Sequence, residues 1–394
     1  MAQEMRLSNF VDDKGTLGNE TIIGGPGAPD TVVRATAAMP PAQAAQTIQN
    51  LGIPMAVYPG VDLTVKFADE IAAAPYNGNE CAWIKAREQS GNYAGINAGD
   101  YIPLTTTNGY TFVNRIMGID TYSGYGDEGH VVGHHIDWNW DELWPTKHAV
   151  NPVNYNNGII PIEDVTADGT ATTFVLTNEM DNVDKIEAGG SALSGWTYDP
   201  ATYTITFESA PAAGTLTVTG TGSEHPYLAC DAYLFMNSLA GQVPNENTTN
   251  PTVKHVDYTE DGIYHYLPQK WKDIIVPKRY YAPKRYNAEN RLPTNNAAGW
   301  CDLGNIWPLA EGELFGMTIQ SDNIYDKVAG PCHYPLFQST AKRAKSDGNS
   351  TRYYMLLNAK DGVYTTWILC APTGASGYHN ASYANIFLSV CFRT

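Results

Sequence analysis

Alternation of apolar and polar residues recurs along the chain and predicts short strands. It is seen at residues 100–104 and 110–113, and the Asn-Gly pair between them is typical of a tight hairpin turn. A shorter stretch of the same kind at residues 83–86 predicts another strand. The continuous apolar run at residues 386–393 predicts a strand buried in the core.

Four segments carry helix signals instead. Residues 40–52 have proline in the first turn and glycine at the end, which is the preferred chemistry of helix termini. Further helices are expected at residues 63–73, 230–239 and 271–276. The next stretch, 277–293, is rich in proline, tyrosine and arginine and is expected to be irregular.

Residues 160–221 differ from their flanks because they are rich in threonine and lack histidine and cysteine. Alternating segments at 168–177, 203–207 and 215–219 are separated by turns of glycine, proline and aspartate. Short strands joined by such turns are typical of a β-sandwich. We therefore predict a small immunoglobulin-like sandwich inserted into a surrounding domain.

The expected organisation is an N-terminal attachment region, a body in two parts and the insert between them. Residues 1–38 contain a Gly/Pro-rich run and little periodic hydrophobicity, so they are expected to form an extended arm that orders only against a partner subunit. The expected boundaries are 1–80 for the arm and helices, 81–158 and 222–394 for the body, and 159–221 for the insert.

Composition excludes several classes of partner. The 394 residues are 43% hydrophobic and 16% charged, which is a globular composition, and the net charge of −17 disfavours nucleic acid and anionic membranes. No run of about 18 apolar residues predicts a membrane span, so no membrane insertion is expected. The first residues lack the basic and apolar pattern of a signal peptide, which favours a soluble protein made in a cytoplasm.

The six cysteines are widely spaced and contain no C-x-x-C pair. This spacing argues against a zinc knuckle, a thioredoxin motif or a dense disulfide framework. Buried free thiols are the favoured interpretation. If any pair closes, Cys370 with Cys391 is the one to test.

The best metal candidate is the sequence GHVVGHHID at residues 129–137. His130 and His134 are four residues apart, the spacing with which two imidazoles on a helix can bind zinc, and His135 follows directly. Valines stand where a metalloprotease carries its catalytic glutamate, and glycines and valines make a poor helix. We expect histidines hydrogen-bonded in an aromatic loop and no metal or other cofactor, with a structural metal as the alternative.

No catalytic motif points to an enzyme. The chain has no G-x-S-x-G or P-loop sequence. Carboxylates such as Asp141 and Glu142, or Glu311 and Glu313, are plentiful, and we expect them on the solvated surface. A binding or structural role is therefore favoured over catalysis.

The segment from Tyr353 to Tyr383 is nearly free of charge and rich in tyrosine, tryptophan, asparagine, serine and threonine. Rigid aromatic rings bury much area at low entropic cost, and the small polar side chains supply adaptable hydrogen bonds. The same rings can stack on sugars. A recognition surface for a protein or a glycan is one interpretation, and a tyrosine-rich β domain with ordinary loops is the other.

Several motifs resemble those of uncharacterised proteins of gut-associated tailed phages and prophages. The resemblance covers about 83–158 and 225–394. It rests on AWIKAR at 82–87, GDYIP at 99–103, TTTNGY at 105–110, LWP at 143–145, YHYLPQ at 264–269, LGNIWPL at 303–309, ELFG at 313–316 and YPLF at 334–337.

The resemblance implies a fold and a set of contact residues. The carboxy-terminal half is similar to C-type-lectin-like tropism determinants varied by diversity-generating retroelements, which implies a mainly β protein with an α+β lectin-like body. Calcium motifs of sugar-binding animal lectins are absent, so calcium chelation of a sugar is not expected, and fold analogy alone does not carry over the oxidase activity that some such folds have. The variable, receptor-contacting positions would be Asn358, Tyr364, Thr366, Trp367, Tyr378, His379, Asn380 and Tyr383.

The expected function is host recognition from the surface of a virion. The partners would be other virion proteins, copies of the same chain (a trimer is favoured) and a glycan or protein receptor on a bacterium. The alternative is a purely structural capsid decoration or baseplate protein, which would bury the same aromatic residues against its neighbours. A metal-dependent hydrolase using His130, His134 and His135 is a third, weaker hypothesis.

Overall fold

Antiparallel strand pairs form most of the regular structure. The structure is a computed structural model that describes residues 21–23, 33–35, 59–123, 133–286, 297–321, 333–338, 340–360 and 365–394. It is 34% strand and 15% helix, and all pairings between its labelled strands are antiparallel. The expectation of a mainly β fold is confirmed.

The body is organised around a four-stranded sheet with the order β20-β5-β4-β3. Its strands are β3 (Tyr101–Thr105), β4 (Thr111–Ile119), β5 (Ile136–Trp140) and β20 (Cys391–Arg393). Because β20 pairs with β5, the two parts of the body that flank the insert are joined in one sheet. The turn between β3 and β4 places Gly109 at a φ of 92°, the left-handed conformation that the predicted Asn-Gly turn needs.

Aromatic side chains of this sheet fill the main core. Trp138 and Trp140 lie two residues apart on β5 and therefore project from the same face. The Trp140 ring stacks on Phe112 of β4 with centroids 4.0 Å apart, and the Trp138 ring meets Trp271 edge-on at 5.5 Å. Asp137, directly before Trp138, points to the other face of the sheet, where it is fully buried.

The helices of the described residues are short. Those predicted at 63–73 and 230–239 are confirmed, the first as two consecutive helices. The one predicted at 271–276 begins earlier and ends sooner, and the one at 40–52 lies outside the described residues. The helices are α2 (Leu63–Lys66), α3 (Ala68–Ala72), α4 (Glu80–Gln89), α5 (Asp231–Asn237), α6 (Gln269–Lys272), α7 (Glu311–Phe315), α9 (Thr340–Arg343) and the 3₁₀ helix η4 (Pro335–Gln338).

The strand predicted at residues 83–86 is wrong, because these residues lie within α4. The Asn79 side chain accepts hydrogen bonds from the backbone N–H groups of Cys81 and Ala82, both at 3.1 Å, and so caps the helix. Cys81 and Ile84, three residues apart, are both buried. Four residues are too few to separate a strand period from a helical one when the segment is read alone.

A second sheet of the body carries the C-terminal candidates. Its order is β17-β18-β19, and its strands are β17 (Tyr354–Ala359), β18 (Thr366–Cys370) and β19 (Ser376–Asn380). Every residue of β17 and β18 is buried, whereas the edge strand β19 has no fully buried residue. The sheet thus offers a rigid interior with one accessible edge.

The apolar run at residues 386–393 is buried as predicted, but only its end pairs as a strand. The part before β20 makes single backbone contacts with two different segments. The Trp144 N–H donates to the Leu388 carbonyl at 2.9 Å, and the Phe387 N–H donates to the Tyr353 carbonyl at 3.0 Å. The run therefore passes between the two sheets of the body and connects them.

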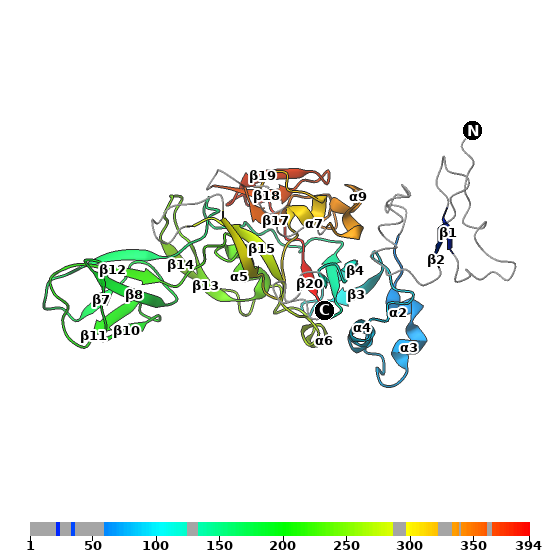
Figure 1. Ribbon diagram of the computed structural model, residues 1–394, viewed down its shortest axis with the longest axis horizontal. Helices are drawn as coiled ribbons and strands as arrows, with labels where there is room; N and C mark the ends of the chain where they lie inside the picture. The colour runs from blue at the N-terminus through cyan, green and yellow to red at the C-terminus, as the bar shows by residue number, and fades with distance from the viewer. Residues whose placement is uncertain are drawn as a thin grey trace.

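Residues 159–221, which we call the insert, form two antiparallel sheets at one end of the molecule, coloured green in Figure 1. Apolar residues of both sheets, including Ile186, Ile205 and Leu216, share a core separate from that of the body. The strands are β6 (Ile162–Ala167), β7 (Thr173–Val175), β8 (Val183–Ala188), β9 (Ser191–Ala192), β10 (Trp196–Asp199), β11 (Thr204–Phe207) and β12 (Gly214–Gly220).

Three two-stranded sheets complete the described structure. They are β1 (Thr21–Ile23) with β2 (Val33–Ala35), β13 (Ala240–Pro244) with β14 (Val253–Asp257), and β15 (Arg279–Lys284) with β16 (Ala297–Asp302). The irregular structure expected over residues 277–293 is therefore wrong for its first half, because β15 pairs with the distant β16. Within the expected extended arm, β1 and β2 pair with each other.

The five cysteines of the described residues are all free and buried, as the favoured interpretation holds, and Cys332 lies outside these residues. Cys370 and Cys391, the pair singled out for a disulfide, are not bonded to each other. Burial raises the pKa of the Cys370 thiol to about 11 and that of Cys391 to about 12. Both side chains therefore behave as small apolar core residues.

Candidate functional site

The eight C-terminal candidates separate into buried and accessible groups. Asn358, Thr366 and Trp367 lie on β17 and β18 and are buried, so a ligand on the surface cannot reach them. Their assignment as receptor contacts is corrected to a supporting role. Tyr364 lies outside the described residues.

Each buried candidate makes a specific internal contact. The Asn358 side chain accepts a hydrogen bond from the Glu311 N–H at 3.0 Å, which ties α7 to β17. The Trp367 indole N–H donates to the Leu356 carbonyl at 2.6 Å. These hydrogen bonds satisfy polar atoms that are buried in the sheet. They therefore stabilise β17 and β18, the strands of the same sheet that support β19.

Glu311 anchors the start of β19. Its carboxylate accepts a hydrogen bond from the Ser376 hydroxyl at 2.9 Å and others from the Ser321 hydroxyl at 2.7 Å and the Ser321 N–H at 3.0 Å. Glu311 and Glu313 are both fully buried, so the expectation that they lie on the solvated surface is wrong. Burial is possible because their oxygens are met by hydrogen-bond donors.

The remaining four candidates, Tyr378, His379, Asn380 and Tyr383, form an accessible group that we call the β19 face. Tyr378 pairs in register with the buried Ile368 of β18, yet its own side chain is 52% exposed because β19 is the sheet edge. The ammonium group of Lys360 lies 3.2 Å from the centroid of its ring. A cation over a tyrosine ring holds that ring in place by about 0.5–1 kcal/mol at an exposed site.

The second aromatic pair of the β19 face is pre-formed. The rings of His379 and Tyr383 are stacked, with centroids 3.5 Å apart and planes 11° from parallel. The Tyr383 N–H donates to the Asn380 carbonyl at 3.0 Å, and the Ser382 N–H donates to the Asn154 side chain at 3.1 Å. The turn after β19 is thereby fixed, and it presents the stacked rings beside the exposed Asn380 side chain.

Sequence reasoning missed Lys360 and Asn154 as parts of this face. Lys360 is one of few charged residues in its segment, but only the pairing of β17, β18 and β19 brings it over Tyr378. Asn154 is 228 positions away from Ser382, and no local signal connects them. With these two residues the face offers ring surfaces, an amide and hydroxyl groups, which suit binding of a polar, partly apolar ligand.

The histidine segment does not assemble a metal site within the described residues. His130 lies outside them, and no group of three or more potential ligands gathers in the part of the chain that is described. His134 contacts Asp120 through Nδ1 at 2.8 Å and remains half exposed. His135 is buried, and its Nε2 accepts a hydrogen bond from the Tyr122 N–H at 3.2 Å. Burial lowers the pKa of His135 to about 4, so its ring is neutral at pH 7.

A buried ionic cluster lies beneath the central sheet and was not foreseen. Arg393 donates to both oxygens of Asp137, at 2.7 and 3.0 Å, and Tyr334 donates to the same carboxylate at 2.9 Å. Lys278 pairs with Glu313, and all four charged side chains are at most 1% exposed. Burial alone would raise the pKa of Asp137, but the surrounding basic groups, Arg393 foremost with its charge and hydrogen bond, together outweigh burial and lower the pKa to about 2. The cluster joins β5, β20 and α7 and has no access to solvent, so its role is structural.

Comparisons with protein-family models, curated proteins and solved structures found no match. In the part of the chain that the structure describes, no helix is long and apolar enough to cross a membrane.

Proposed function

We propose that the chain is a virion protein of a tailed bacteriophage, displayed on the particle surface, which binds a bacterial surface glycan or protein through the β19 face. The observation that carries the proposal is the exposure of Tyr378 on an edge strand whose neighbouring strand, β18, is fully buried. An exposed tyrosine beside a pre-formed aromatic stack is the composition of hot spots in recognition surfaces.

Rigidity of the supporting sheet favours binding. Glu311 and Asn358 anchor β19 and α7 to the interior, and Lys360 holds the Tyr378 ring. Residues already fixed in their bound conformation lose less entropy when a partner arrives. The β19 face therefore suits recognition better than a loose tyrosine-rich loop would.

The finer fold assignments belong to the same proposal. We propose a C-type-lectin-like body and an immunoglobulin-like insert, with residues 1–80 attaching the chain to other virion proteins in a homotrimer. The resemblance of the body motifs supports the first, and the two-sheet arrangement with its own core supports the second. The function proposed is binding, without catalysis and without a cofactor.

A purely structural role, as a capsid decoration or baseplate protein, is the second candidate. The same exposed aromatic residues favour it, because rings left uncovered on one chain can pack against a neighbouring subunit. The two functions differ in what covers Tyr378 in the assembled particle. Cryo-electron microscopy of that particle decides between them: an outward β19 face supports host recognition, and a face buried by other subunits overturns it.

Replacing Tyr378 by alanine tests the recognition function in solution. We expect the purified chain to lose at least about tenfold in affinity for the bacterial surface, because a hot-spot tyrosine contributes about 2 kcal/mol or more. Binding of labelled protein to bacterial cells measures the effect. The matched control is Tyr110→Ala, which removes another partly exposed tyrosine far along the chain, in the turn before β4. Equal binding by both variants and the unsubstituted chain would contradict the proposal.

A further inference from the structure

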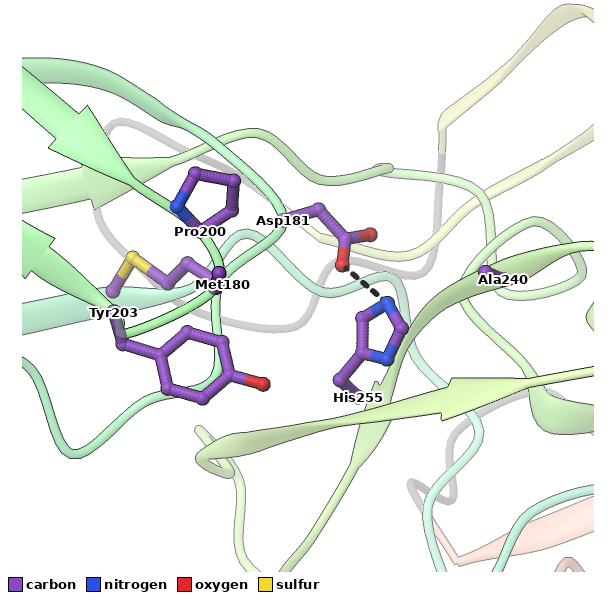
Figure 2. Close-up of a pocket in the computed structure, with 7 residues that line it drawn as sticks. Met180, Asp181, Pro200, Tyr203, Ala240 and His255 are labelled. Atoms are coloured by element: carbon purple, nitrogen blue, oxygen red, sulfur yellow. Dashed lines mark ion pairs between the residues drawn. The ribbon is translucent and has the colours of Figure 1, made fainter.

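A cleft of about 550 Å³ lies where the insert meets the β13–β14 hairpin of the body. Met180, Asp181, Pro200 and Tyr203 line it from the insert, and His255 lines it from β14. Figure 2 shows the Tyr203 ring and the Asp181 carboxylate entering the gap from one side and the His255 ring from the other. The cleft is distinct from the β19 face, and it has the size of a small-molecule site.

The two walls of the cleft are held together by hydrogen bonds, so the cleft is already formed. The Val253 N–H donates to the Asn178 side chain at 2.9 Å, and the His255 N–H donates to the Glu179 side chain at 2.8 Å. Val253 of β14 is also buried in the core of the insert. The hairpin therefore packs on the insert as part of one unit, and binding of a ligand need not spend free energy on ordering the walls of the cleft.

The polar side chains that line the cleft pair with each other (Figure 2). Asp181 Oδ1 and His255 Nε2 are 3.5 Å apart, and both side chains remain partly exposed. Partial burial raises the pKa of the Asp181 carboxyl group. A carboxylate accepts hydrogen bonds, whereas a histidine ring can donate or accept, so together they match the hydroxyl groups of a neutral ligand.

Tyr203 supplies an aromatic surface, and its backbone conformation is unusual. Its φ is 53°, in the left-handed region that a bulky residue rarely adopts. The Leu176 N–H holds the Tyr203 carbonyl at 2.8 Å, and Asp199 fixes the preceding turn by accepting from the Ala201 N–H at 3.0 Å. Strained residues of this kind cluster at ligand sites. Here the strain places the ring in the cleft beside Met180.

We propose that this cleft binds an uncharged sugar ring, which stacks on Tyr203 and donates its hydroxyl groups to Asp181 and His255. The aromatic ring suits the apolar C–H face of a sugar, and the neighbouring pair of hydrogen-bonding groups suits its hydroxyl groups. Among the described residues that line the cleft there is no lysine or arginine, and the chain carries a net charge of −17, so phosphorylated or sulfated ligands are disfavoured. This inference does not depend on the virion function proposed above.

The test is saturation-transfer NMR of the full chain with four uncharged sugars, namely glucose, galactose, rhamnose and N-acetylglucosamine, each at millimolar concentration. Two variants remove the proposed contacts. Tyr203→Gly deletes the ring at a position where glycine adopts the observed φ without strain, and its backbone carbonyl still accepts from the Leu176 N–H, so the turn is retained. Asp181→Asn keeps the size of the side chain and removes its charge. The matched control is Tyr110→Ala, which removes an exposed tyrosine outside both the cleft and the β19 face. Tyr378→Ala is added to detect a sugar bound at the β19 face.

We expect transfer to at least one sugar, a loss of at least about tenfold in affinity in both cleft variants, and an unchanged signal in Tyr110→Ala. Absence of transfer to all four sugars would overturn the proposal, as would transfer that both cleft variants retain. A signal lost only in Tyr378→Ala would place the sugar on the β19 face and also overturn it. That last outcome would support the function proposed for the β19 face. The experiment therefore distinguishes failure of the cleft proposal from failure of the β19-face proposal.

Discussion

At the scale of single residues, the main feature of the core is a set of buried charged side chains. Asp137, Glu313, Lys278 and Arg393 lie in the interior although charged residues are rarely buried without partners. Each has a partner of opposite sign, and tyrosine hydroxyls fill further hydrogen-bonding positions. Removing one partner of such a pair leaves an uncompensated charge in a medium of low polarity.

Replacing Asp137 by asparagine is expected to lower the free energy of unfolding by about 3–5 kcal/mol, because Arg393 is left buried without its counter-charge. Urea unfolding at pH 7 measures this. Asp302→Asn is the control, since it removes the carboxylate of an exposed pair with Arg279 and should change stability far less. Equal effects of the two substitutions would contradict a structural role for the buried pair.

The same pair predicts a pH dependence. The pKa of Asp137 is lowered from 3.8 to about 2, so its contribution to stability is fully present above about pH 4 and is lost as the pH falls toward 2. We expect the stability difference between the unsubstituted chain and Asp137→Asn to shrink over that range. Unfolding curves at several pH values between 2 and 5 measure it, and a constant difference would speak against the assignment.

At the scale of elements, helix termini decide where a helix forms, and sheet edges decide which strand stays accessible. α4 exists where a strand was expected because Asn79 caps it and residues at helical spacing meet the core. β19 stays accessible because it is the last strand of its sheet, and its sequence SGYHN is more polar than the sequence TWILC of β18. Helix capping is local chemistry, whereas the position of a strand within a sheet depends on distant pairing.

Asn79→Ala is expected to reduce stability by about 0.5–2 kcal/mol, because two N–H groups of the first turn of α4 lose their acceptor. Asn79→Asp should retain most of that stability, since a carboxylate accepts the same hydrogen bonds and favours the helix N-terminus. Thermal unfolding of the three proteins measures the ranking. Equal loss in both variants would show that the cap itself does not stabilise α4.

At the scale of the whole molecule, the insert and the body have separate apolar cores. The insert leaves and re-enters the body at one place, since Ile159 and Ser223 exchange backbone hydrogen bonds of 2.8 and 2.7 Å. Chain ends that lie so close can be joined by a short turn. The four-stranded sheet of the body, by contrast, depends on the pairing of β5 with β20, which lie on opposite sides of the insert in the sequence.

Replacing residues 162–220 by a short glycine-rich turn should leave the body folded. We expect a cooperative thermal transition and a near-ultraviolet circular dichroism spectrum that keeps the signals of buried tryptophans such as Trp138 and Trp140. Stability should fall, because Val253 loses its place in the core of the insert. Loss of the cooperative transition would show that the two cores fold only together.

The sequence by itself determined the mainly β character of the chain, the hairpin between β3 and β4 and several helices, because alternation, turn residues and helix ends are local signals. It also marked the segment from which the β19 face is built. Only the tertiary structure decided that Trp367 supports that face while Tyr378 is exposed, since this depends on which strand lies at the sheet edge. The buried ionic cluster, the strand β15 and the cleft at His255 likewise join residues far apart in the chain. Their contacts follow from long-range pairing, which leaves no local pattern.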